Sequence, residues 1–255
     1  MCIVDSTPVE CARSRPTVKR SNLAGWAGYS YCPSHSRFFW GLQLHLICTP
    51  AGLPVTWALA DPKLDERQVL MAVLDHDPTL TGRRDGSTII ADKGYVSAEL
   101  DRFLAERGVA LLRPSYRNRA PHPGEHLLKP IRQLIESVND TLKGQLDLEL
   151  HGGCSIDGIG VRIAQRLLAL TAAIWHNRAT GRARHPIPDR LRPLVEFGLT
   201  RLADRVAVVG HDGLLQQVSA VGVEWSDLVQ RPSGQPLSLG EGELERGDGI
   251  VVVDR

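Results

Sequence analysis

The chain has 255 residues, 42% of them hydrophobic, which suits a globular protein with one large domain or two small ones. No apolar run approaches the ~20 residues that a membrane-spanning helix needs, and the first residues do not resemble a signal peptide. The five cysteines are odd in number and scattered, which favours reduced thiols. We therefore expect a cytoplasmic protein with no membrane partner.

The net charge of +1 conceals an uneven distribution of charge. Residues 224–255 carry seven acidic and three basic side chains, a balance of −4, so the preceding residues carry +5. This mild basicity permits a nucleic-acid partner without requiring one.

The first 36 residues combine a short strand with an irregular basic segment. Residues 1–8 predict a buried strand that ends at Asp5 and is stopped by Pro8. Residues 9–36 mix basic residues with Gly, Ser, Pro and aromatic residues. A solvated loop and a loop that contacts phosphates both account for this composition. The basic residues are Arg13, Arg15, Lys19 and Arg20.

The following segments predict a hairpin and then alternating helices and strands. Strands are expected at 37–48, 53–59, 87–91 and 109–112, and helices at 65–75, 97–107, 130–143 and 156–177. A turn between the first two of these strands makes them an antiparallel hairpin. A hairpin followed by strand–helix–strand crossovers predicts an α/β fold, a mixed sheet with helices on its faces.

The composition changes after Asn177. Residues 178–192 are rich in Arg and Pro and predict a linker. Residues 193–255 have weak periodicity and many glycines, which leaves a C-terminal extension of uncertain fold. The domain prediction is therefore one α/β domain over residues 1–177, a linker and this extension.

The helix expected at 130–143 carries two stripes of side chains. The apolar stripe is formed by Ile131, Leu134, Ile135, Val138 and Leu142. Arg132, Glu136 and Lys143 lie within about 40° of one another on a second stripe. The first stripe is suited to packing on a core, with a carboxylate between two cations beside it.

Three carboxylates are candidates for one site. Asp5 and Asp92 each follow an apolar strand, and in an open sheet sites form outside the carboxyl ends of parallel strands. Glu136, on a helix packed across that end, would complete a cage of three carboxylates. Mg²⁺ prefers oxygen ligands, and two such ions can activate an attacking oxygen and stabilise a leaving oxygen at a phosphodiester.

A purely structural role would also account for a carboxylate after a buried strand, since such residues commonly cap turns. Asp65 and Glu66 could add acidity to the site, although the start of an exposed helix accounts for them equally well. A zinc site that uses Cys32 and His35 lacks a second pair at ligand spacing.

Arg132, Glu136 and Lys143, separated by three and six residues, resemble the arginine–glutamate–lysine signature of bacterial insertion-sequence transposases of the Asp-Asp-Glu class. Lys129 stands where that signature usually has tyrosine. The segment Ile90-Ala-Asp92-Lys-Gly-Tyr95 resembles the second motif of the family, and Ile3-Val-Asp5-Ser-Thr7 the first. Three further similar segments are Trp40-Gly-Leu-Gln-Leu-His45, Ala51-Gly-Leu-Pro54 and Asp65-Glu66-Arg67.

This resemblance, which covers about residues 2–177, implies a ribonuclease H-like catalytic domain with a mixed five-stranded sheet. It implies phosphoryl transfer on DNA that depends on Mg²⁺ or Mn²⁺, with Asp5, Asp92 and Glu136 as metal ligands and catalytic residues. The implied partners are element ends and target DNA, with a possible homodimer. Expected DNA contacts are Arg132, Lys143, Lys93, Arg13, Arg15, Lys19 and Arg20.

Members of this class normally carry a DNA-binding segment before the first aspartate, whereas only four residues precede Asp5. We therefore expect an N-terminally truncated transposase. Two alternatives stay open: an inactive remnant that at most binds DNA, and a simple metal-dependent nuclease.

Overall fold

The computed structural model describes residues 1–32, 36–82, 87–115, 125 and 128–181, together with three strands after residue 205. The elements are β1 (Cys2–Ala12), α1 (Arg15–Arg20), β2 (Gly28–Cys32), β3 (Arg37–Cys48), β4 (Pro54–Ala60), α2 (Glu66–His76), α3 (Thr79–Gly82), β5 (Ser87–Ile90), the 3-10 turn η2 (Lys93–Tyr95), α4 (Ala98–Glu106), β6 (Val109–Leu112), α5 (Leu128–Gly144), the 3-10 turn η4 (Leu148–Leu150), α6 (Ile156–Ala179), β7 (Val206–Gly210), β8 (Leu215–Val218) and β9 (Gly249–Val253).

The strands form one mixed sheet in the order β6-β5-β1-β3-β4-β9-β7-β8, with β2 paired to the first half of β3. β3 pairs antiparallel with both β1 and β4, whereas β5 pairs parallel with both β1 and β6. The run β4-β3-β1-β5-β6 confirms the predicted mixed five-stranded core. Its order and directions are those of a ribonuclease H-like fold, and the described sheet is extended by further strands.

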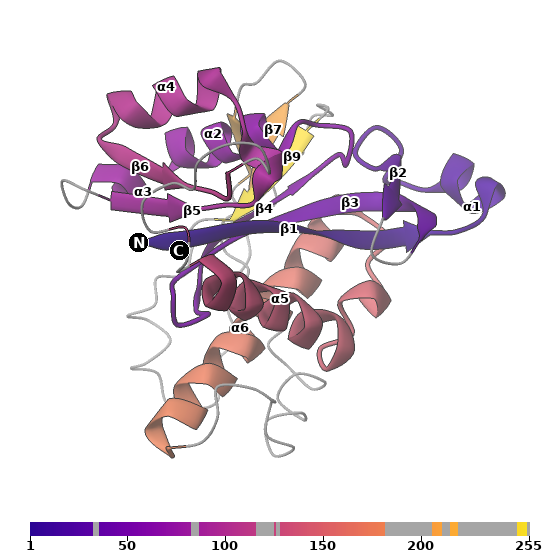
Figure 1. The fold of residues 1–255 in the computed structure, drawn as a ribbon. Helices are drawn as coiled ribbons and strands as arrows, with labels where there is room; N and C mark the ends of the chain where they lie inside the picture. Colours follow the sequence, from indigo (N-terminus) through magenta and orange to yellow (C-terminus); the bar gives the residue numbers. More distant parts are fainter. Residues whose placement is uncertain are drawn as a thin grey trace, which may run out of the picture.

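Helices cover both faces of this sheet, as predicted (Figure 1). Helices α5 and α6 pack on one face, where Leu42, Leu44 and Leu46 of β3 are buried. Helices α2 and α4 pack on the other face, where Val4 and Ile47 are buried. Strands β1 and β3 therefore lie between two hydrophobic clusters, which holds them firmly in the middle of the domain.

The amphipathic pattern of α5 fixes its orientation on the sheet. Ile135, Val138 and Leu142 are almost fully buried, and burial of such a side chain stabilises a fold by roughly 1.5–3 kcal/mol. Glu136 is exposed beside this stripe. The predicted helix is confirmed, and it begins at Leu128, two residues earlier than expected.

The prediction that the first strand ends at Asp5 is wrong, because β1 continues to Ala12 and pairs with β3 along its length. Pro8 does not stop it. Strand β5 pairs with β1 at Cys2 and Ile3, and among the described strands none continues this pairing as far as Pro8, so a missing N–H is tolerated there. Residues 9–36 are also more ordered than predicted, since they contain α1 and β2.

The predicted linker lies largely outside the described residues, and so does most of the C-terminal extension. Its three described strands continue the sheet, with β9 antiparallel to β4 and β7 between β9 and β8.

Removal of residues 182–255 is expected to leave thermal unfolding cooperative, because both described hydrophobic clusters are built from residues before 175. Strand β4 would become an edge, so a lower solubility is expected. Circular dichroism melts of the two chains test this. A broad melt of the shortened chain would show that the extension belongs to the cooperative core.

Candidate active site

The three carboxylates predicted from the sequence line one small cavity of about 50 Å³. Asp5 reaches it from β1, Asp92 from the residues directly after β5, and Glu136 from α5. Arg132, one helical turn before Glu136, lines the same cavity. The remaining lining residues are Ile3, Val4, Ile90, Ala91 and Ile135. Beyond Ile3, strands β1 and β5 no longer pair, and this separation opens the sheet at the site.

The environment of Asp5 disfavours its charged form. Burial raises the pKa of Asp5 from 3.8 to about 6, and the negative charges of Asp92 and Glu66 act in the same direction. The backbone N–H of Ser6 and the charge of Arg132 partly oppose this rise in pKa. A bound cation would cancel the repulsion and replace the lost hydration of the carboxylate.

Asn139 of α5 supports Asp5 directly, and sequence reasoning missed it. Its Nδ2 donates a hydrogen bond to Oδ2 of Asp5 at 2.9 Å, and the residue is 9% exposed. The available signal was its position in α5, next to Val138 in the buried stripe. A buried amide beside apolar residues requires a polar partner.

Asp92 is fixed by the tight turn that follows β5. Its Oδ1 accepts a hydrogen bond from the backbone N–H of Gly94 at 2.7 Å, which caps η2. A Cβ atom at position 94 would lie 2.9 Å from Oδ1 of Asp92 and 3.3 Å from Oε2 of Glu66. Both carboxylates therefore crowd this position, which favours glycine in the turn.

The predicted cations have different positions. Arg132 is exposed on α5 and lines the carboxylate cavity. Lys143, near the end of the same helix, is not among the residues that line it. Lys93 is exposed directly after Asp92. Of these cations, the structure therefore brings Arg132 to the three carboxylates.

A larger cavity of about 410 Å³ adjoins the small one, because Arg132 and Glu136 line both. Its other lining residues are Pro114, Glu125, Leu128 and Gln133. Its volume is within the range of small-molecule pockets, so a nucleotide-sized group has room beside Glu136.

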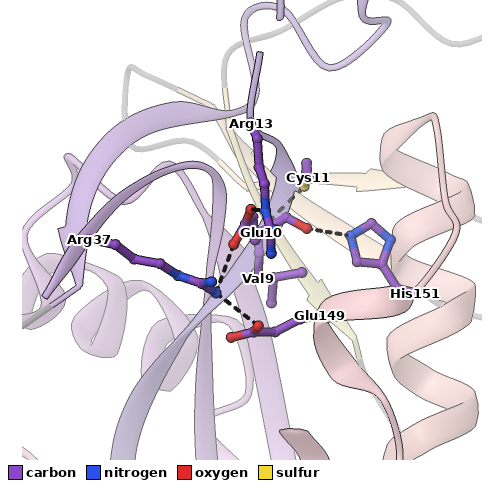
Figure 2. Close-up of polar contacts among 7 residues, drawn as sticks. All are labelled: Val9, Glu10, Cys11, Arg13, Arg37, Glu149 and His151. Atoms are coloured by element: carbon purple, nitrogen blue, oxygen red, sulfur yellow. Dashed lines mark hydrogen bonds and ion pairs between the residues drawn. The ribbon is translucent and has the colours of Figure 1, made fainter. Parts of the chain in front are cut away.

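The basic residues of the N-terminal segment divide into two groups. Arg15, Lys19 and Arg20 are exposed on α1, which has no buried residue. Arg13 instead forms an ion pair with Glu10 of β1 (Figure 2). The α1 residues are accordingly better placed than Arg13 for contacts with a separate molecule.

The end of β1 is anchored by the polar network drawn in Figure 2. Arg37 of β3 forms ion pairs with Glu10 at 2.8 Å and with Glu149 of η4 at 2.9 Å. His151 accepts a hydrogen bond at Nδ1 from the N–H of Gly153, so its Nε2 carries the proton and donates to the carbonyl of Glu10 at 3.1 Å. Burial lowers the pKa of His151, which favours this neutral form.

Glu66, left undecided by the sequence, turns toward the site, whereas Asp65 does not. Oε1 of Glu66 accepts a hydrogen bond from Oγ of Ser6, the neighbour of Asp5. Burial raises the pKa of Glu66, and the charge of Asp92 contributes to the rise. Asp65 caps α2 and forms an ion pair with Arg67. The tertiary structure therefore distinguishes the positions of two adjacent carboxylates, which the sequence could not distinguish.

The donor set of this site suits a hard divalent cation. All candidate ligands are carboxylate oxygens, and Mg²⁺ is usually held by one or two carboxylates together with substrate phosphates. Among the residues that the structure describes, no three His, Cys, Asp or Glu side chains are grouped closely enough to hold a metal ion by themselves, so phosphate oxygens of a DNA substrate would have to supply further ligands. The described cysteines are free thiols, and His35 of the alternative zinc site lies outside the described residues.

The sheet order and the two helical layers define a protein of the ribonuclease H-like class. Residues 1–156, more than half of the chain, match the family model described as the transposase DDE domain. The chain belongs to this transposase family, which places it in the polynucleotidyl transferase class of enzymes. No curated protein matches the chain. None of the helices in the described ranges has the length and apolar character needed to cross a bilayer.

Proposed function

We propose that this chain cleaves element ends and joins them to target DNA, with Asp5, Asp92 and Glu136 as its catalytic carboxylates. The observation that carries the proposal is the convergence of these side chains and Arg132 on one cavity from three elements. Membership of the transposase DDE-domain family supports the class of reaction.

The proposed reaction consists of two phosphoryl transfers. In the first, water attacks a phosphodiester at the element end, and the bond to the leaving 3′-oxygen breaks, which frees a 3′-hydroxyl. In the second, this hydroxyl attacks a phosphodiester of the target DNA, forms a new bond to phosphorus and releases a target 3′-hydroxyl. Each transfer exchanges one oxygen on phosphorus for another.

Asp5, Asp92 and Glu136 would hold Mg²⁺ or Mn²⁺, which would activate the attacking oxygen and stabilise the leaving one. Arg132 would contact the phosphate, because this residue lines the same cavity as the carboxylates. The exposed α1 residues Arg15, Lys19 and Arg20 would contact more distant phosphates, and Lys93 and Lys143 would add weaker contacts.

The Asp92→Asn variant is expected to lose at least about a hundredfold in the nicking of supercoiled plasmid DNA in Mn²⁺, since stabilisation by a catalytic metal contributes several kcal/mol. Asparagine keeps an oxygen that can accept the hydrogen bond from Gly94, so the turn should persist. Gel analysis of plasmid forms over time measures the loss.

Asp140→Asn is the matched control, because Asp140 is exposed on α5 and does not line the cavity. It should nick DNA at the rate of the unaltered chain. Cleavage in Mn²⁺ that survives Asp92→Asn would overturn the assignment of the site. Cleavage without joining of a 3′-hydroxyl end would indicate a simple nuclease, and a folded chain that binds DNA without cleaving it would indicate a remnant.

A further inference from the structure

We infer that Glu66 is a fourth acidic residue of this site, a positioning residue that ties the strand of Asp5 to the turn of Asp92 and adds negative charge for cation binding. This inference rests on the proposed function. Glu66 belongs to α2, and this helix packs on the opposite face of the sheet from α5, which carries Glu136 (Figure 1).

The alternation of side chains along β1 explains how residues from both faces of the sheet come close to Asp5. Asp5 faces α5, where it contacts Asn139. Ser6, the next residue, faces α2, where it contacts Glu66. Successive side chains of a strand point to opposite faces, so a single peptide unit connects the carboxylate of Asp5 to the partner of Glu66.

The hydroxyl group of Ser6 is held in one orientation. Nε2 of Gln43 on β3 donates to Oγ of Ser6 at 2.8 Å, and the hydroxyl donates its own proton to Oε1 of Glu66. A serine hydroxyl has one proton to donate, so Glu66 receives it. This chain of contacts fixes β1 at the position that presents Asp5.

The second carboxylate oxygen of Glu66 lies beside the turn that presents Asp92. A Cβ atom built on Gly94 would lie 2.9 Å from Oδ1 of Asp92 and 3.3 Å from Oε2 of Glu66, so both carboxylates border the space beside this glycine. Arg67, the next residue of α2, donates to the carbonyl oxygen of Val96 at 2.9 Å, which docks the start of α2 on this turn. Glu66 thus contacts the strand of Asp5 through Ser6, while its other oxygen lies near the turn of Asp92.

A buried hydroxyl group without a partner provides an independent indication of a ligand. Oη of Tyr95 makes no hydrogen bond within the described structure, and the residue is 1% exposed. Burial and the charges of Glu66, Asp5 and Asp92 raise its pKa, so the hydroxyl keeps its proton as a donor. An unsatisfied buried donor is costly, and a polar ligand that accepted a hydrogen bond from this hydroxyl would remove the cost.

The experiment measures the binding of Mn²⁺ alone to the full chain by isothermal titration calorimetry, without DNA. Glu66→Gln keeps an acceptor for Ser6 but removes the charge, and is expected to weaken Mn²⁺ binding about tenfold, as loss of a nearby charge would. Ser6→Ala keeps the charge but removes the link, and is expected to weaken binding about threefold through misplacement of Asp5.

Asp65→Asn is the matched control, because this adjacent carboxylate is already paired with Arg67. It should bind Mn²⁺ within about twofold of the unaltered chain, since its charge is compensated locally. The rise in melting temperature on addition of Mn²⁺, measured for each variant, provides a second readout and shows that each variant is folded.

The outcomes separate this inference from the proposed function. Unchanged Mn²⁺ affinity in Glu66→Gln, with affinity lost in Asp92→Asn, would overturn the role of Glu66 alone. Equal losses in Glu66→Gln and Asp65→Asn would also overturn it, because they would show a general effect of charge on α2. Absence of Mn²⁺ binding by the unaltered chain would overturn both proposals.

Discussion

Replacing Asp5 with asparagine is expected to raise the melting temperature of the metal-free protein at pH 7.5 while it abolishes DNA cleavage. The pKa of Asp5 is raised from 3.8 to about 6 in the folded chain. Ionisation of this carboxyl group therefore costs the fold up to about 3 kcal/mol at neutral pH. Asparagine keeps an oxygen that can accept the hydrogen bond of Asn139. A gain of about 3–8 °C is expected for a chain of this size.

The size of this stabilisation depends on pH. Below the unfolded pKa of 3.8 both states hold the proton, so Asp5 imposes no cost. As the pH rises past about 6, the folded state must also ionise, and the cost reaches its full value. The stabilisation by Asp5→Asn should thus vanish near pH 4. Differential scanning calorimetry in EDTA at both pH values measures it, with Asp140→Asn as a neutral control. A destabilised variant at pH 7.5 would show that the ionised carboxylate is favourably held.

The second large expected effect concerns Arg37, whose removal should lower the free energy of unfolding by roughly 2–4 kcal/mol, because the buried carboxylate of Glu10 loses the less exposed of its two paired cations. Glu10 is 9% exposed, and its Oε2 lies 2.8 Å from Nη2 of Arg37 without the geometry of a hydrogen bond, so the contact is electrostatic. Arg37→Ala also removes the pair with Glu149. The strand that carries Asp5 would lose its anchor at the far end. Urea denaturation measures the change.

Arg13→Ala is the control for this prediction. Arg13 also pairs with Glu10, but its side chain is 76% exposed, so its loss should cost less than about 1 kcal/mol. Adding Glu10→Gln to Arg37→Ala should recover part of the stability, because a neutral amide is less costly to bury than an unpaired charge. Equal effects of Arg13→Ala and Arg37→Ala would contradict this account of the network.

The fold of the first 177 residues could be predicted because its signals are local. Alternating Leu42, Leu44 and Leu46 indicated a strand, and the stripe from Ile131 to Leu142 indicated a helix with one face on a core. The extent of β1 could not be predicted in this way. Pro8 is a local stop signal, and its cost depends on whether a neighbouring strand needs the missing N–H, which is decided by where β5 ends.

The residues at the start of α2 also could not be assigned from local sequence signals. Asp65 and Glu66 are chemically alike and adjacent, so no sequence pattern separates a helix cap from a carboxylate directed at Asp92. The contacts with Arg67 and Ser6 separate them. Asn139 was likewise missed, since a single polar group in an apolar pattern acquires a role only from the side chain opposite it.

Local patterns in the chain were sufficient to predict the α/β class, the order of the core strands and helices, and three carboxylates as candidates for one site. Periodicity and turn chemistry act between near neighbours, so they can be read from the chain alone. The tertiary structure was needed to show that Asp5, Asp92 and Glu136 line one cavity, that Glu66 contacts Ser6 from the opposite face of the sheet and that burial raises the pKa of Asp5. These properties depend on distances across the sheet and on the exclusion of water, which arise when β1, β5, α2 and α5 pack together.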